Sequence, residues 1–345
     1  MKHKLPALKH IHFSPKETLS AITQNALLLI DLHMSNQCNL KCPGCYRDAG
    51  RSLSDELTYT ECCDVLTQAK ELGARTWVVT GSGEPFLDKK FRPLVTYANS
   101  LGLGVIVFTN NTSITPEIAL WISRQNMSVV AKINSFLPHV QDEIVGVTGA
   151  HTHIYAGLRH LMNVGLHKSG RLGLDSVIVR QNYKEIPTIF RFCRDNGIVP
   201  YITTELHGGR GVINAPSLDI DVTQIRKMFF HLRDIDNTEY GYDWEPHPPV
   251  VVEGSCKKIL YQLHVGPTGS ISICPGIRAS LGNVRQMSLM DAVMSDLVQK
   301  VRHLNMPSCP ICKEKRSSIQ KCTGGCLLSK EHSGNMFGTD PQCCW

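Results

Sequence analysis

The chain has 345 residues, enough for two domains or equally for one barrel-sized domain with an appendage. Its content of 42% hydrophobic and 19% charged residues is typical of a globular protein. The formal net charge is +6, but no long basic run accompanies it and no apolar stretch could cross a bilayer, so neither nucleic acid nor a membrane is expected as a partner. The N-terminus lacks the apolar core of a secretory signal, which indicates the cytoplasm. Fourteen cysteines in a reducing compartment indicate metal or redox chemistry rather than disulfides.

Strand-like and helix-like segments alternate along the first two thirds of the chain. Short apolar strands that alternate with amphipathic helices predict a parallel sheet joined by right-handed crossovers. Six such units without a seventh or eighth predict an α/β fold, a partial (βα)6 TIM-like barrel open on one side, with ligands at the C-terminal ends of the strands. The predicted strands are 26–34, 76–80, 104–110, 128–134, 172–180 and 199–206, and the predicted helices are 55–72, 88–101, 115–125, 151–164, 183–196 and 222–235.

After residue 206 the alternation stops. Residues 207–221 are rich in Gly, Pro and Asn and are expected to form an irregular connection, and the Pro-rich stretch 245–255 is expected to be a linker. Eight of the fourteen cysteines follow it, so metal ligation is expected to hold this last part together. Within it, "GPTG" separates two alternating stretches and predicts a hairpin. The predicted parts are an N-terminal extension (1–23), the barrel (24–221), a helix and linker (222–254) and a small cysteine-rich domain (255–345).

Three cysteines, Cys38, Cys42 and Cys45, directly follow the first predicted strand in "CNLKCPGC". Structural zinc sites use four ligands and [4Fe–4S] clusters are normally held by four cysteines, so this set is one ligand short. The second strand ends in "GSGEP", residues 81–85. Its glycines let a ligand approach the backbone closely, and Glu84 can accept a hydrogen bond from a cationic amine.

Together these motifs resemble the radical S-adenosylmethionine (SAM) enzymes. In that family three cysteines hold three irons of a [4Fe–4S] cluster, and the fourth iron is bound by the amino and carboxylate groups of SAM. "GSGEP" is similar to the family's Gly-Gly-Glu-Pro loop, with Ser82 in place of a glycine. Ser135 and Arg180 fit a SAM-binding role and that of a solvated loop residue equally well. The resemblance implies that SAM contacts come from Gly81, Ser82, Gly83 and Glu84, from Tyr46 at the adenine, from Asn110 at the ribose, and from Ser135 and Arg180.

The C-terminal cysteines resemble a SPASM domain, which carries two auxiliary [4Fe–4S] clusters in many radical SAM enzymes. One departure is the nine-residue gap between Cys312 and Cys322. The inner cluster lacks an obvious fourth ligand: a local residue, a spare terminal cysteine or an open site that binds substrate all remain possible. A zinc ribbon is the alternative to this reading. The resemblance assigns Cys309, Cys312, Cys322 and one of Cys343 and Cys344 to the outer cluster, and Cys256, Cys274 and Cys326 to the inner one.

The remaining cysteines fall on predicted helices. Cys62 and Cys193 lie on apolar faces and are expected to pack in the core, whereas Cys63 is turned about 100° away from Cys62. Radical epimerases of this superfamily use a free thiol as hydrogen donor, which makes Cys63 and Cys193 candidates for that role.

Three polar residues follow the sixth predicted strand at the open mouth of the barrel. They are Glu205, His207 and Arg210. An arginine flanked by glycines suits a carboxylate, phosphate or hydroxyl-rich ligand, so these residues are candidate substrate contacts.

The resemblance implies that a flavodoxin or ferredoxin reduces the first cluster, and that SAM is cleaved to a 5′-deoxyadenosyl radical that abstracts hydrogen from an unactivated C–H bond. Electron transfer to the auxiliary clusters gives oxidation, and a thiol hydrogen donor gives epimerisation. Because only about 25 residues precede the first strand, too few for a folded leader-binding module, a small polar substrate (a sugar, aminocyclitol or nucleoside intermediate) is expected. Modification of a peptide or protein is the alternative, and a non-enzymatic iron–sulfur or zinc-binding protein is the rival from another class.

Overall fold

The computed structural model describes residues 5–204, 208–246, 257–303, 325–338 and 340. Two predicted substrate contacts and six predicted metal ligands lie outside these ranges. They are Glu205, His207, Cys256, Cys309, Cys312, Cys322, Cys343 and Cys344.

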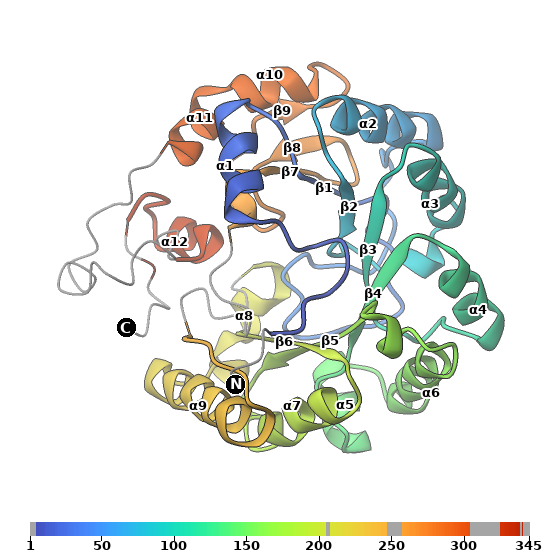
Figure 1. The fold of residues 1–345 in the computed structure, drawn as a ribbon, viewed down its shortest axis with the longest axis vertical. Coiled ribbons are helices and arrows are strands. Elements are labelled where there is room, and N and C mark those ends of the chain that lie inside the picture. Colours follow the sequence, from blue (N-terminus) through green and yellow to red (C-terminus); the bar gives the residue numbers. More distant parts are fainter. Residues whose placement is uncertain (1–4, 205–207, 247–256, 304–324, 339, 341–345) are drawn as a thin grey trace.

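Six parallel strands in chain order form the centre of the molecule, and the helices surround them as an outer ring (Figure 1). This arrangement confirms the α/β fold and the partial barrel predicted from the alternating pattern. The strands are β1 (Leu29–Leu32), β2 (Thr76–Val79), β3 (Gly104–Thr109), β4 (Met127–Lys132), β5 (Leu172–Ile178) and β6 (Val199–Thr204). The covering helices are α2 (Tyr59–Glu71), α3 (Phe91–Ser100), α4 (Pro116–Arg124), α5 (Pro138–Val145), α6 (Ala150–Asn163) and α7 (Ile186–Asp195).

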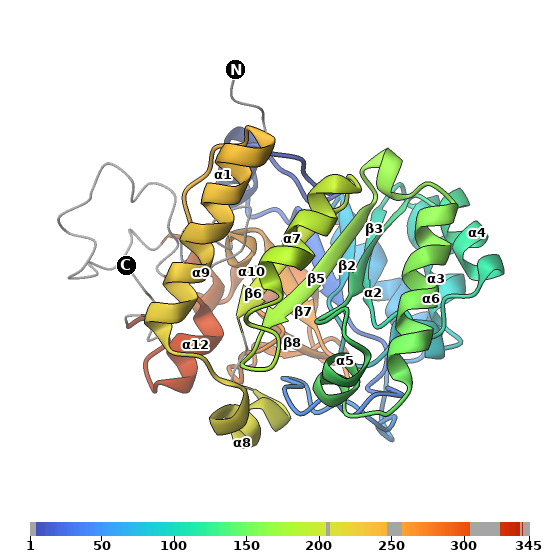
Figure 2. The same cartoon turned by 90° about the horizontal axis from the view of Figure 1, so that it is seen from below.

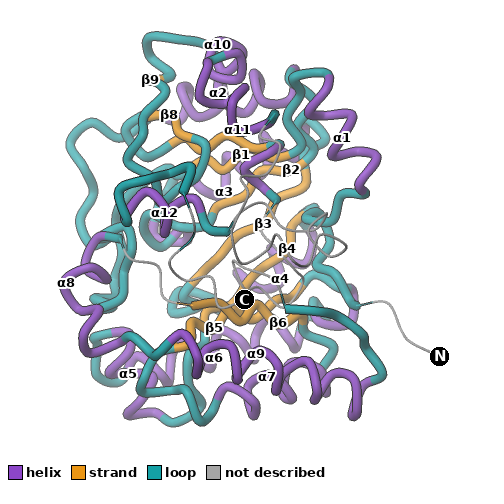
Figure 3. Tube along the Cα trace, turned by 90° about the vertical axis from the view of Figure 1, so that its left-hand side faces the viewer, coloured by secondary structure: helices purple, strands orange, loops and turns teal. Residues whose placement is uncertain are grey.

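The sheet continues beyond β1 into the cysteine-rich part of the chain. Strand β7 (Gln262–Val265) pairs in parallel with β1, and β8 (Ser270–Ser272) returns antiparallel to β7. The hairpin predicted from "GPTG" is therefore confirmed, and Gly269 adopts the left-handed φ of +85° that its turn requires. Strand β9 (Gly282–Asn283) pairs with β8. The strands thus form one continuous sheet in the order β6-β5-β4-β3-β2-β1-β7-β8-β9 (Figure 3).

Alternate residues of the strands point to opposite faces of the sheet and form two cores. The smaller core lies on the inner face and contains Leu29, Val78, Ile106 and Val130. Leu8 of the N-terminal segment belongs to it and is 1% exposed. The extension before the barrel is therefore part of the folded structure, and it includes helix α1 (Pro15–Thr23).

Two hydroxyls on the strands fix this N-terminal segment. Thr76 Oγ1 at the start of β2 donates to the His10 carbonyl (2.7 Å), and Ser128 Oγ of β4 donates to the Lys9 carbonyl (3.0 Å). The segment thus covers the N-terminal ends of the strands. Helix α8 lies at the opposite end of the molecule (Figure 2).

The chain after the barrel is more regular than its sequence indicates. The prediction of an irregular connection at 207–221 is wrong over most of that range. Helix α8 spans Gly209–Leu218, with Pro216 inside its last turn. Helix α9 (Val222–Ile235) follows as predicted. The last helices are α10 (Leu289–Met294), α11 (Asp296–Arg302) and α12 (Leu327–His332). In the described ranges no helix has both the length and the apolar character needed to span a membrane.

A buried ion pair joins the barrel to the segment after α9. Arg194 of α7 donates to both carboxylate oxygens of Asp236 at 2.8 and 2.7 Å, and Trp244 Nε1 donates to the same carboxylate at 2.8 Å. The side chains of Arg194 and Asp236 are 3% and 0% exposed. Because both charges are out of water, each depends on the other.

Replacing Asp236 with alanine leaves the Arg194 guanidinium buried without its anion. We expect Asp236→Ala to lower the free energy of unfolding by about 3–5 kcal/mol, measured as a lower urea midpoint by tryptophan fluorescence. The control is Glu239→Ala, since Glu239 forms the same type of bidentate pair with Arg191 at the surface and its loss should leave the midpoint nearly unchanged. Equal shifts in the two variants would contradict this account.

Candidate functional site

The loop after β1 carries Cys38, Cys42 and Cys45 and is folded back on itself. The backbone N–H of Leu40 lies 3.5 Å from Cys38 Sγ, and the N–H of Ala49 lies 3.3 Å from Cys45 Sγ. Backbone N–H groups directed at sulfur stabilise a thiolate. The backbone of the loop thus holds two of the three sulfurs, those of Cys38 and Cys45.

The electrostatics of this loop favour a bound cation. Burial, together with the neighbouring Cys45 and Cys38 thiols, raises the pKa of Cys42 to about 12. Burial also raises the pKa of Cys38. Thiolates so close together in a low dielectric are unfavourable until a metal neutralises them. The donor set therefore fits three irons of a [4Fe–4S] cluster.

The "GSGEP" loop after β2 lies directly against the cysteine loop. Gly81 has a left-handed φ of +96°. A Cβ at Gly83 would lie 2.0 Å from the Gln37 carbonyl oxygen, a distance that no side chain can occupy. The same carbonyl accepts the N–H of Glu84 at 2.7 Å. The glycine thus lets the two loops meet backbone to backbone.

The Glu84 carboxylate links the ends of β2 and β3. It is 3% exposed and accepts from Thr109 Oγ1 (2.8 Å), Asn110 N (2.7 Å) and Phe86 N (3.1 Å). Burial raises its pKa to about 7. The Asn110 side-chain amide in turn lies 3.9 Å from Cys38 Sγ. Glu84 and Asn110 therefore border the cysteine loop, as a SAM-binding site requires, and their contacts with SAM remain predictions.

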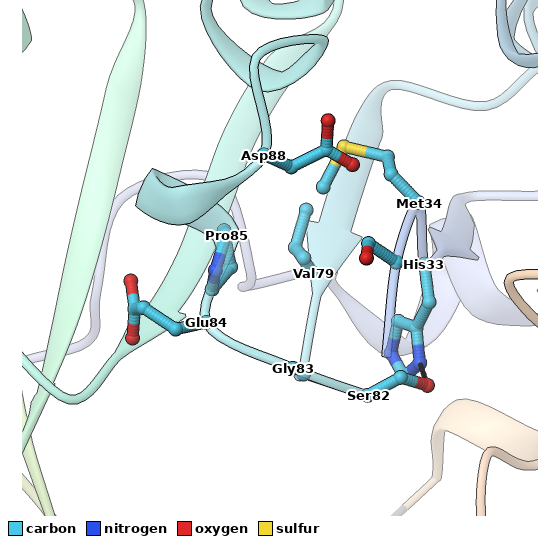
Figure 4. Close-up of a pocket in the computed structure, with 10 residues that line it drawn as sticks. His33, Met34, Val79, Ser82, Gly83, Glu84, Pro85 and Asp88 are labelled. Atoms are coloured by element: carbon cyan, nitrogen blue, oxygen red, sulfur yellow. Dashed lines mark hydrogen bonds between the residues drawn. The ribbon is translucent and has the colours of Figure 1, made fainter. Parts of the chain in front are cut away.

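Ser82 points away from Glu84, towards His33 (Figure 4). Its Oγ lies 2.7 Å from His33 Nδ1 and 3.3 Å from Arg47 Nε. His33 also contacts Asp31 on the inner face of β1. Asp31 in turn lies beside His264 of β7. The sequence analysis missed this buried group. The available signal was the pair of polar residues at alternate positions in the otherwise apolar strand "LIDLH".

Three predicted SAM contacts have other surroundings. The hydroxyl of Tyr46 is hydrogen-bonded to Thr80, and burial raises its pKa. Ser135 is fully buried, with Oγ 2.5 Å from Glu185. Arg180 is exposed and donates to the Asp219 carbonyl (3.2 Å). The structure thus brings Tyr46 to the barrel interior and gives Ser135 and Arg180 partners within the protein.

Arg210, an expected substrate contact, holds the cysteine loop instead. Its guanidinium donates to the carbonyls of Cys42 (3.1 Å) and Ala49 (2.8 Å) and to Asp48 (2.7 Å). The preceding Gly209 leaves room for this approach, because a Cβ there would lie 2.6 Å from the Cys45 carbonyl. The glycines of "HGGR" therefore let α8 pack on the cysteine loop.

The cysteines on the helices lie in the larger core, between helices and sheet. Cys62 and Cys193 are fully buried there, which confirms the expected core packing. Cys63 is 9% exposed and accepts a hydrogen bond from Tyr59. The hydrogen-donor role of Cys63 and Cys193 remains a prediction.

Two expected ligands of the inner auxiliary cluster lie on segments that pack together. Cys274 follows β8, and Cys326 directly precedes α12. Glu331 of α12 accepts from the backbone N–H groups of Arg278 and Ala279 (2.7 and 2.9 Å), just beyond Cys274. This contact ties the two cysteine segments to each other.

The auxiliary segment also touches the first cysteine loop. Arg47, two residues after Cys45, donates from Nη1 to the carbonyl of Pro275, next to Cys274. The buried Asp340 carboxylate accepts from the backbone N–H of Cys326 (2.6 Å). An electron acceptor held by Cys274 would therefore lie beside the loop that holds the first cluster.

Family models match both parts of this arrangement. The model of the radical SAM superfamily matches residues 32–212, which is more than half of the chain. The chain is a member of the radical SAM superfamily. The model of the SPASM iron–sulfur cluster-binding domain matches residues 256–323. The cofactors of this radical SAM protein are thus a [4Fe–4S] cluster that binds SAM and auxiliary iron–sulfur clusters.

Curated relatives align along nearly the whole chain. The mycofactocin maturase MftC of Mycolicibacterium smegmatis is 24% identical over 334 residues, covering 92% of this chain and 83% of the relative. The AdoMet-dependent heme synthase of Methanosarcina barkeri is 22% identical over 354 residues, covering 93% and 97%. Among solved structures, Streptococcus suis SuiB bound to its precursor peptide SuiA superposes with a TM-score of 0.70 at 15% identity, covering 95% and 79%. This likeness supports the fold.

A side chain at Gly83 should separate the two loops of the site. We expect Gly83→Ala to lower SAM cleavage about tenfold or more, because its Cβ collides with the Gln37 carbonyl. The assay is formation of 5′-deoxyadenosine by the reduced, reconstituted enzyme. The matched control is Gly50→Ala in the cysteine loop, where a Cβ meets nothing within 4 Å. Retention of full cleavage by Gly83→Ala would show that the close contact is unnecessary.

Proposed function

We propose that this radical SAM protein with its SPASM domain modifies a peptide. The observation that supports this most is the proximity of the two cysteine segments, joined through Arg47 and Pro275, which suits a reaction that passes an electron from the substrate to an auxiliary cluster. Relatives of similar length include a mycofactocin maturase, and a fold neighbour was solved with its precursor peptide. These likenesses favour the peptide alternative over the sugar-like substrate expected from the sequence.

The bound cluster and SAM supply a 5′-deoxyadenosyl radical, which abstracts hydrogen from an unactivated C–H bond. The chain's own residues hold the reacting carbon and exclude water. The inner face of the barrel carries polar side chains beyond the apolar layer. Lys132 and Asp175 form an ion pair on β4 and β5 (2.6 Å), and Asp31 and His264 form another on β1 and β7. Such a lining suits a polar peptide segment rather than an apolar one.

Several finer features belong to the same proposal. A flavodoxin or ferredoxin supplies the electron, and the reaction is an oxidation or an epimerisation in the cytoplasm. The described SAM-site residues and auxiliary ligands keep the roles that the family resemblance implies, with Ser135 and Arg180 also bonded within the protein. The domain boundaries at residues 221 and 254 stay as predicted. Arg210 donates to the cysteine loop, and its contact with the substrate remains a prediction.

The test is turnover of a short peptide encoded beside this gene. We expect the reconstituted, dithionite-reduced enzyme to change the mass of the synthetic peptide, by loss of two hydrogens for oxidation or by deuterium uptake from solvent for epimerisation. Liquid chromatography with mass spectrometry measures this change. SAM cleavage coupled to a tetrapyrrole or a sugar, with the peptide unchanged, would contradict the peptide assignment.

The matched controls are two cysteine variants. Cys42→Ala removes a ligand of the first cluster and should abolish both SAM cleavage and the mass change. Cys62→Ala removes a fully buried core thiol and should preserve both. A chain that takes up zinc instead of about 12 irons for three clusters, and that cleaves no SAM, would contradict the enzyme assignment itself.

A further inference from the structure

A second group of potential metal ligands lies in the barrel, apart from the cysteines. Asp31 and His264 occupy directly paired positions of β1 and β7, on the inner face of the sheet. His33 follows Asp31 by two residues and therefore points to the same side. The exposed fractions of Asp31, His33 and His264 are 1%, 1% and 2%.

The spacing of these side chains matches a coordination sphere. His33 Nε2 lies 3.1 Å from Asp31 Oδ1, and His264 Nδ1 lies 3.5 Å from Asp31 Oδ2. One ligand atom from each of the three residues lies within 4.8 Å of the others. Ligand atoms bound at about 2.1 Å in a tetrahedral site are about 3.4 Å apart. Small side-chain adjustments thus suffice to close the sphere.

Among the described residues, the ring nitrogens of the buried His264 have only Asp31 as a charged partner, at the Nδ1 side. Within the described part of the chain, neither of its ring nitrogens makes a hydrogen bond of normal geometry, and Nδ1 stands at an ion-pair distance from Asp31. A buried polar group without a partner is unfavourable, and native structures rarely leave one. Its nitrogens therefore point to a ligand within the barrel.

The surrounding hydroxyls are arranged as outer-sphere partners of a metal. Ser82 Oγ lies 2.7 Å from His33 Nδ1, and His33 Nε2 lies 3.0 Å from Thr80 Oγ1 and 3.1 Å from Asp31 Oδ1. Thr80 Oγ1 donates to Asp31 Oδ2 at 2.9 Å. Metal-binding histidines characteristically use their second nitrogen in this way, which fixes the ring. The contact with His33 thus explains why a serine stands at position 82, where the family's loop has a glycine.

One cation lies beside the group. Arg47 Nε is 3.3 Å from Ser82 Oγ, the hydroxyl that contacts His33. Its guanidinium opposes a second cation at this position.

We propose that Asp31, His33 and His264 bind one divalent first-row transition-metal ion, distinct from the iron–sulfur clusters. Two imidazoles and one carboxylate are a ligand set for Zn²⁺, Fe²⁺ or Mn²⁺. Positions left open on such an ion would take water or a polar group of the substrate. The site is independent of the peptide assignment, because its ligands are all supplied by the chain.

The test uses Mn²⁺ as the probe and the tag-free, fully reconstituted protein in its oxidised state, in which the [4Fe–4S] clusters are EPR-silent. Titration of Mn²⁺ should show the loss of the free-ion EPR signal with about one ion bound per chain. His264→Gln, His33→Gln and Asp31→Asn should each weaken binding about tenfold or more. The matched control is His153→Gln on the exposed face of α6, which should bind as the parent chain does.

Iron content and SAM binding of each variant show whether it is folded. An undiminished free-ion signal with the parent chain would overturn the proposal. So would variants that are loaded with iron and bind Mn²⁺ as tightly as the parent, since the ion would then lie elsewhere. Because neither result depends on turnover, the proposal can fail while the peptide-modifying function stands, and the reverse.

Discussion

The site depends on one backbone contact between the ends of the first two strands. The Gln37 carbonyl accepts the N–H of Glu84 at 2.7 Å, and Gly83 passes so close that a Cβ would lie 2.0 Å from the same oxygen. This contact sets the cysteine loop against the loop that is expected to bind SAM. Its consequence is that the expected cluster ligands and the expected SAM contacts lie on adjoining loops.

The other features of the molecule support that contact from both sides. Arg210 fixes the cysteine loop from α8 through two of its carbonyls, and Arg47 ties the loop to the auxiliary segment at Pro275. The N-terminal segment covers the far ends of the strands with apolar side chains such as Leu8. The barrel is thus apolar at one end and polar at the other, where chemistry is expected.

Sequence patterns predicted the parts of the fold that repeat. Six strands and the helices between them, except α5, were predicted from periodicity, and the hairpin before Cys274 was predicted from its turn residues. Helix α8 was missed because Gly208, Gly209 and Pro216 mark loops in isolation, whereas here the glycines are needed for close packing on the cysteine loop. Local composition cannot report such a tertiary contact.

In the candidate site, too, the residues in local motifs were predicted and those brought together by the fold were not. Its cysteines and "GSGEP" lie in short local motifs, so the sequence reveals them. The neighbourhood of Asp31 and His264 arises because β7 pairs with β1 across most of the chain, and no local pattern indicates that pairing. Arg210 was assigned to substrate because its residue type suits anions, whereas the fold gives it three partners in the cysteine loop.

The cluster held by Cys38, Cys42 and Cys45 is expected to keep one iron free for SAM. The most direct measurement is EPR of the dithionite-reduced protein with Cys274 and Cys309 replaced by alanine, so that the first cluster dominates the spectrum. We predict that adding SAM shifts the g values, because its amino and carboxylate groups bind that iron. A cluster signal that is identical with and without SAM would contradict the account.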